Sequence, residues 1–185
     1  MNQISRGAVL CGALAWLAMA PRAGAAVAPP ASAAGVDKAA VPGWFIDQEA
    51  GLRTALAPTA AVIERTRGAV IVRYPARLAF AADQAELLPA GSAMLDVLLH
   101  SLRDHKRTQL VVAVYTDTIG SVEFNQQQAQ ARAAAVVAYL QTRGIAADRL
   151  IARGVGEGEQ LPAPNTPEGR DLNRRLELTI TPLSS

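Results

Sequence analysis

The feature that most constrains the fold is a short apolar run, QLVVAVY at residues 109–115, followed after a turn by a long Ala- and Gln-rich segment. The run is the right length for a buried strand and is rich in β-branched residues. The segment after it has apolar residues at helical spacing, and Gly144 suits the position just past a helix end. A buried strand that leads directly into a long helix predicts an α/β fold.

The same reasoning predicts the remaining elements. Leucines at helical spacing predict a helix that begins near Pro89, because proline suits the first turn of a helix. Along the chain we expect a helix at 44–56, a hairpin turning at Arg67-Gly68, a short strand at 77–80, the helix from Pro89, the strand at 109–115, the helix ending at Gly144, a strand at 150–153, a Gly- and Pro-rich loop at 154–168, a helical turn at 167–172 and a closing alternating strand at 175–180. The expected architecture is a two-layer α/β sandwich of a mixed β-sheet with two main helices, preceded by a small helix-and-hairpin appendage.

The first 25 residues are typical of a secretory signal peptide. Arg6 supplies the positive start, residues 8–20 form an apolar run, and Ala23-Gly24-Ala25 offers a small-x-small cleavage site. We therefore predict four parts: a signal peptide at 1–25, an Ala/Pro-rich linker at 26–42, the helix and hairpin appendage at 43–75 and the main domain at 76–183. No other segment approaches the ~20 apolar residues of a membrane-spanning helix, so we expect an exported protein without one.

Charge and cysteine content exclude several classes of function. The chain has 18 Lys and Arg against 16 Asp and Glu, and two of the basic residues, Arg6 and Arg22, lie in the predicted signal. The rest is neutral, so we expect no nucleic-acid partner. The only cysteine, Cys11, would leave with the signal, and Leu10 before it argues against lipidation. The two histidines lie together on one helix, so we predict no metal, no cofactor and no catalytic centre.

An acid and a base flank the turn between the apolar run and the long helix. Asp117 lies at the strand end, and Arg132 lies on the helix face that also carries Asn125, Val136 and Leu140. One interpretation is an ion pair between Asp117 and Arg132, which contributes only ~0–1 kcal/mol when exposed. The other is a receptor for a zwitterionic amino-acid head group, with an ammonium at Asp117 and a carboxylate held by Arg132. Spacing alone favours the ion pair and does not separate the two.

Several short motifs occur in a characteristic order between residues 78 and 181. They are FAADQAELLPAG with its acid Asp83, Thr116-Asp117-x-x-Gly120, Asn125, Arg132-Ala133, Gly144, Gly154-x-Gly156-Glu157 and Gly169-Arg170-x-x-Asn173-Arg174-Arg175. Together they resemble the OmpA-like C-terminal domain of Gram-negative envelope proteins. The segment upstream of residue 80 is similar to the one that precedes this domain in members without a barrel.

The resemblance implies non-covalent binding of peptidoglycan through the diaminopimelate of its stem peptide, in a protein that tethers or organises the cell envelope. It places the ammonium on Asp117 and the carboxylate on Arg132, and it places Asp83, Thr116 and Asn125 along the same groove. It also implies a periplasmic location, with any tie to the outer membrane peripheral and through a partner. The sequence departs from the family pattern at positions that bear on the groove walls, which include Val114, Gln128 and Ala129.

An alternative is an envelope structural or assembly protein that docks another envelope protein through residues 44–74. A further expectation concerns Arg174 and Arg175, which precede an alternating strand. Their side chains should face opposite ways, so that one supports the fold through a nearby carboxylate.

Overall fold

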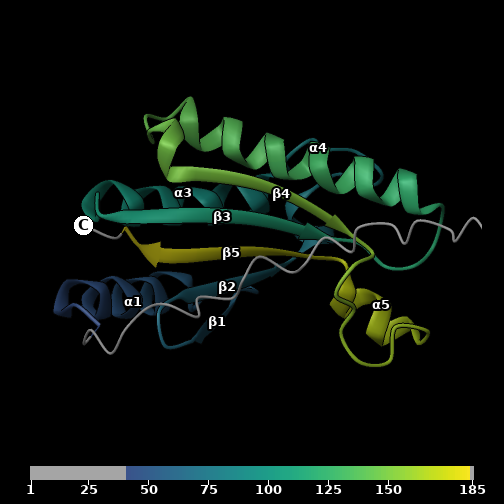
Figure 1. Cartoon of the computed structure of the whole chain (residues 1–185), viewed down its shortest axis with the longest axis horizontal. Helices are drawn as coiled ribbons and strands as arrows, with labels where there is room; N and C mark the ends of the chain where they lie inside the picture. The colour runs from purple at the N-terminus through teal and green to yellow at the C-terminus, as the bar shows by residue number, and fades with distance from the viewer. Residues whose placement is uncertain (1–40, 184–185) are drawn as a thin grey trace, which may run out of the picture. The chain divides into compact units, whose positions relative to one another are not determined.

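The computed structural model describes residues 41–183, and the predicted signal peptide and almost all of the predicted linker lie outside this range. A five-stranded sheet has the order β1-β2-β5-β3-β4 (Figure 1). The strands are β1 (Val62–Arg65), β2 (Val70–Pro75), β3 (Thr108–Tyr115), β4 (Leu150–Gly156) and β5 (Arg175–Pro182). Strands β3 and β4 pair in parallel and the other neighbours pair antiparallel, which confirms the predicted mixed sheet.

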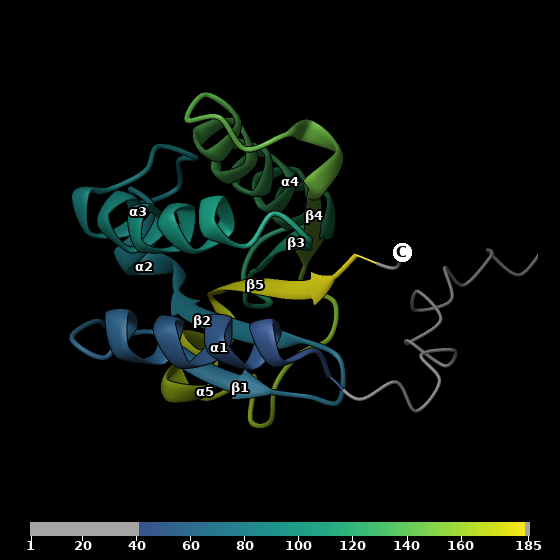
Figure 2. The same cartoon turned by 90° about the vertical axis from the view of Figure 1, so that its left-hand side faces the viewer.

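The helices are α1 (Gly43–Leu56), α2 (Ala76–Ala79), α3 (Pro89–Asp104), α4 (Val122–Gln141), the 3-10 turn η1 (Ala147–Arg149) and α5 (Pro167–Asn173). Helices α1, α3 and α4 share one apolar core with the inner face of the sheet, and α4 runs along β4 (Figures 1 and 2). The predicted two-layer arrangement is therefore confirmed. Within residues 41–183, no helix has both the length and the apolar character needed to cross a membrane.

The sheet has one apolar and one polar face because strand side chains alternate. In β5, Leu176 and Leu178 are fully buried on the helical side, whereas Arg175 and Glu177 form an ion pair at 2.8 Å on the other. Helix α4 lies directly on β4 at Gly154, where an added Cβ would come within 2.4 Å of the backbone nitrogen of Gln130. This close approach brings α4 onto β4, and a second one, between Gly156 and Gln126, lies nearer the start of the helix.

The strand predicted at 77–80 is wrong. Residues Ala76–Ala79 form the short helix α2, and Phe80 makes only an isolated bridge with Leu87. The fully buried residues of this segment are Ala76, Ala79 and Phe80, whose spacing of three and four is helical rather than alternating. The helical turn places the Phe80 ring in the core, below the cleft described next.

The helix and hairpin predicted at 43–75 are present as α1, β1 and β2, and they join the same sheet and core as the rest of the domain. Strand β2 pairs with β5 from Val70 opposite Ile180 to Pro75 opposite Arg175. Helix α1 buries Phe45 and the leucines of its second half in the same core as the rest of the protein. Local patterns predicted the helix and the hairpin correctly, but they did not reveal that β2 lies inside the sheet.

Candidate functional site

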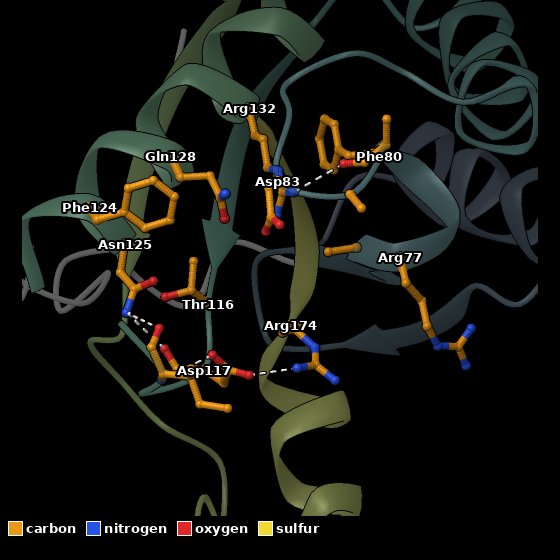
Figure 3. A pocket seen from close by; sticks show the side chains of 14 residues that line it. Arg77, Phe80, Asp83, Thr116, Asp117, Phe124, Asn125, Gln128, Arg132 and Arg174 are labelled. Atoms are coloured by element: carbon orange, nitrogen blue, oxygen red, sulfur yellow. Dashed lines mark hydrogen bonds and ion pairs between the residues drawn. The ribbon is translucent and has the colours of Figure 1, made fainter. Parts of the chain in front are cut away.

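A cleft of about 350 Å³ opens where the end of β3 meets the start of α4 and the turn at residues 81–84 (Figure 3). All five residues predicted as a site line this cleft. The end of β3 leads into Thr116 and Asp117, helix α4 contributes Asn125 and Arg132, and the turn before α3 contributes Asp83. The fold thus brings the 81–84 turn, which precedes α3, next to the junction of β3 and α4.

Asp117 is buried, and both of its carboxylate oxygens accept hydrogen bonds. Oδ1 accepts from the backbone N–H of Ile119 at 3.1 Å, which closes the turn in the manner of an Asx-turn. Oδ2 accepts from Nη1 of Arg174 at 2.6 Å. The Asp117–Arg132 ion pair that spacing favoured is therefore wrong: the acid pairs instead with Arg174, which lies between α5 and β5.

Arg132 is only 8% exposed, and it forms no salt bridge with any carboxylate in residues 41–183. Its Nε donates to the carbonyl of Gln84 at 2.8 Å, and its Nη2 donates to the carbonyl of Ala81 at 3.3 Å. The guanidinium carbon lies 5.2 Å from the centroid of the Phe80 ring, a cation–π distance.

Burial lowers the pKa of Arg132, and the nearby negative charge of Asp83 partly opposes that shift. The guanidinium still keeps its charge at neutral pH, because the ordinary pKa of arginine is so high. Burying a cation costs free energy when some of its N–H donors lack acceptors and no anion is paired with it. The electrostatics of this end of the cleft therefore favour an anionic ligand group.

Asp83 lies exposed at the rim of the cleft. Its backbone has a φ of 54°, in the left-handed region that aspartate tolerates better than most residues. The turn it belongs to supplies both carbonyls that accept hydrogen bonds from Arg132. The negative charge of Asp83 also favours the charged form of that arginine. The prediction that Asp83 contacts a ligand stays untested by this geometry.

Asn125 and Thr116 have different roles in the wall of the cleft. The side-chain amide of Asn125 donates to the carbonyls of Asp117 and Ile119, at 3.3 and 3.1 Å, and to Oε2 of Glu157 at 3.1 Å. Asn125 therefore holds the turn that carries the acid. The hydroxyl of Thr116, by contrast, is buried without a hydrogen-bond partner among the described residues, 41–183, and lies on the cleft (Figure 3).

Two further residues line the cleft: Gln128, which the sequence analysis placed on the groove walls but not among the site residues, and Phe124, which it missed. Gln128 lies one helical turn before Arg132, so the spacing of the helix already pointed to it. Phe124 is 51% exposed at the mouth of the cleft. Of the three family departures weighed above, Val114 and Ala129 are fully buried in the core, and only Gln128 reaches the cleft.

The pair Arg174 and Arg175 behaves as the alternation predicts. Arg174 lines the cleft and pairs with Asp117 and Asp171. Arg175 faces the polar side of the sheet, where it pairs with Glu177 and lies 3.7 Å from the centroid of the Tyr115 ring. Both arginines thus have carboxylate partners, whereas the buried Arg132 forms no salt bridge within residues 41–183.

Comparison with known proteins places this geometry in a family. The family model described as the OmpA family matches residues 79–174. The probable lipoprotein YiaD of Escherichia coli K12 is 33% identical over 142 residues, which cover 76% of this chain and 65% of YiaD. The peptidoglycan-binding protein ArfA of Mycobacterium tuberculosis is 34% identical over 103 residues, covering 56% of this chain and 32% of ArfA. The chain thus spans less than two thirds of either relative.

Solved structures share the fold. A putative MotB-like protein from Desulfovibrio vulgaris superposes with a TM-score of 0.68 at 23% identity, covering 76% of this chain and 92% of that one. The cell wall anchor of the T6SS from Pseudomonas aeruginosa superposes with a TM-score of 0.63 at 26% identity, covering 71% and 96%. The family match, together with the fold and the order of the motifs, shows that this chain belongs to the OmpA family.

Proposed function

We propose that this protein binds peptidoglycan non-covalently through the diaminopimelate of its stem peptide and so tethers or organises the cell envelope. The observation that carries the proposal is that the buried Arg132 forms no salt bridge in residues 41–183, while Asp117 lies in the same cleft. Two relatives whose names specify peptidoglycan binding or cell-wall anchoring support the same class of ligand.

The distal end of diaminopimelate carries an ammonium and a carboxylate on one carbon. The planar fork of Arg132 suits the carboxylate, because two parallel N–H donors can meet its two oxygens. Asp117 suits the ammonium, because an ionised carboxylate has about four lone-pair sites. Ile119 and Arg174 each use one of them, which leaves acceptor capacity for the ligand.

The proposal is for a binding protein rather than an enzyme. The residues that line the cleft include one hydroxyl, that of Thr116, and include no histidine or cysteine that would activate it. The predicted signal peptide at 1–25 makes export to the periplasm part of the proposal, with the linker at 26–42 and the domain that follows acting outside the cytoplasm. Any association with the outer membrane is proposed to be peripheral.

Retention on purified sacculi of the diaminopimelate type tests the proposal. Arg132→Met keeps much of the side-chain packing but removes the charge, and Asp117→Asn keeps the Oδ1 acceptor of the turn. Each should lower retention at least about tenfold, the loss expected for a charge-assisted hydrogen bond. The matched controls are Arg67→Met and Asp47→Asn, which change the same charges on exposed residues outside the cleft.

Circular dichroism and thermal unfolding establish that each variant is folded. Folded Arg132→Met that is retained as well as the wild type would refute the assignment of the anchors. Absence of wild-type retention would refute peptidoglycan binding itself and would favour the alternative, docking of an envelope protein through residues 44–74.

A further inference from the structure

Two polar atoms in the cleft are buried without a hydrogen-bond partner in residues 41–183. They are Oγ1 of Thr116 and Nε2 of Gln128. Thr116 is 4% exposed, and both side chains line the cleft and point into it (Figure 3). Buried polar groups in folded proteins are almost always hydrogen-bonded, so two exceptions in one cleft indicate the position of a ligand.

Each of these neutral groups lies next to one of the two charged anchors. Gln128 precedes Arg132 by one turn of α4, so both side chains project from the same face of the helix. Thr116 directly precedes Asp117 at the end of β3. The end of the cleft that suits an anion therefore has an additional N–H donor, and the end that suits a cation has an additional oxygen acceptor.

We propose that Gln128 is a specificity-determining residue whose side-chain amide donates to the same ligand carboxylate as Arg132. Thr116 is the corresponding neighbour of Asp117, and its hydroxyl accepts from the ligand ammonium. This inference rests on the proposed function. It implies that the cleft selects its ligand mainly by the carboxylate of the head group. A stem peptide with lysine at the same position offers the ammonium alone and leaves both Arg132 and Gln128 without an anion.

Two synthetic stem tripeptides that differ only in their third residue, diaminopimelate or lysine, test this inference. NMR titration follows weak as well as tight binding. Gln128→Leu should weaken binding of the diaminopimelate peptide about tenfold and leave binding of the lysine peptide unchanged, because only the first has the carboxylate. Thr116→Val should weaken both peptides by a similar factor, because both keep the ammonium.

Gln127→Leu is the matched control, since Gln127 is an exposed neighbour on α4 that does not line this cleft. Gln128→Met provides the same comparison if the leucine variant is poorly folded. Equal weakening of both peptides by the Gln128 variants, or no weakening of either, would overturn the inference while peptidoglycan binding stands. Failure of the wild type to bind the diaminopimelate peptide would instead overturn the proposed function.

Discussion

Two arginines near opposite ends of β3 use their guanidinium groups in different ways. Arg149, in the turn before β4, donates from Nε to the carbonyl of Thr108 at 2.7 Å and from Nη1 to the carbonyl of Leu102 at 2.9 Å. Its Nη2 donates to the carbonyl of His105 at 2.9 Å and to Oγ1 of Thr108 at 3.1 Å. Arg132 donates only to the two carbonyls of the 81–84 turn and faces a cleft.

Burial lowers the pKa of both arginines, and a nearby aspartate partly opposes the shift in each case. A perturbed pKa therefore does not separate a structural arginine from a binding one. The two arginines differ in how many of their N–H donors remain without an acceptor in residues 41–183. Arg149 satisfies carbonyls at the end of α3, which helix geometry leaves open, and every nitrogen of its guanidinium is engaged. Arg132 has N–H donors without a partner in residues 41–183, and we propose that the ligand carboxylate accepts from them.

The largest expected effect is on the structural arginine. Arg149→Met removes all four hydrogen bonds and leaves several partly buried carbonyls without a donor, so the free energy of unfolding should fall by about 3 kcal/mol. Urea unfolding measures the loss. The folded variant should bind sacculi as the wild type does. Reduced binding by fully folded protein would contradict the assignment of a purely structural role to Arg149.

A smaller effect is expected from Arg132→Lys, which keeps the charge and loses the planar fork. Lysine binds a carboxylate as a point charge, so affinity for the diaminopimelate peptide should fall about tenfold. The free energy of unfolding should change by only about 1 kcal/mol, because just two hydrogen bonds to carbonyls are involved. Isothermal titration calorimetry and urea unfolding measure the two quantities. Unchanged affinity would mean that charge alone holds the ligand.

The sequence predicted Arg132 because the residue interrupts an otherwise apolar helical stripe and matches a family motif. It did not predict the partner of Asp117, because Arg174 lies 57 residues away and reaches the acid only through the order of strands in the sheet. The structural role of Arg149 was missed for the same reason, since its acceptors belong to α3 and β3. Local pattern identifies candidate side chains, whereas strand order decides which of them meet.

The inward position of β2 also depends on strand order. Alternation in 70–75 is compatible with a separate hairpin and with a central strand, and only pairing with β5 decides between them. The short helix α2 was missed because four residues carry too little pattern to separate a turn of helix from a strand. Gln128 was named only as a departure from the family pattern, because a glutamine in a Gln-rich helix carries no signal of a binding role of its own.

The arginines on the polar face of the sheet differ from Arg149 and Arg132 because they pair with a carboxylate, Glu177, and a pH titration can test this difference. Burial opposes ionisation of Glu177, but hydrogen bonds and charges from Arg175 and Arg73 outweigh it and hold the pKa of its carboxyl below the ordinary 4.5. A depressed pKa contributes stability above the unfolded-state value, and that contribution is lost as the pH falls through the lower folded-state pKa. The free energy of unfolding should therefore fall as the pH drops below about 4.5.

Glu177→Gln should reduce the dependence of stability on pH in this acid range. Because Arg149 has carbonyls and a hydroxyl rather than a carboxylate as hydrogen-bond partners, Arg149→Met should remove a similar amount of stability at pH 7 and at pH 4. Urea unfolding of both variants across this range checks the pair of expectations. A loss from Arg149→Met that shrinks on acidification would show that its contribution is coupled to a titrating group.

The smallest effect is expected at Arg174, which engages one oxygen of Asp117 with a side chain that is 42% exposed. Asp117 is buried but the arginine side of the pair is open to solvent, and glutamine keeps an N–H donor for the acid, so Arg174→Gln should lower the free energy of unfolding by only about 1 kcal/mol. In the proposed complex Asp117 accepts from both Arg174 and the ligand ammonium, and these two cations repel each other, so the variant should bind the diaminopimelate peptide as tightly as the wild type or a few-fold more tightly. Calorimetry measures the affinity, and Arg170→Gln on α5 is the control for charge. A loss of affinity in Arg174→Gln alone would instead make Arg174 part of the receptor. The cleft would then hold its ligand with two cations, Arg132 and Arg174. Unused N–H donors would no longer be the criterion that distinguishes a binding arginine from a structural one.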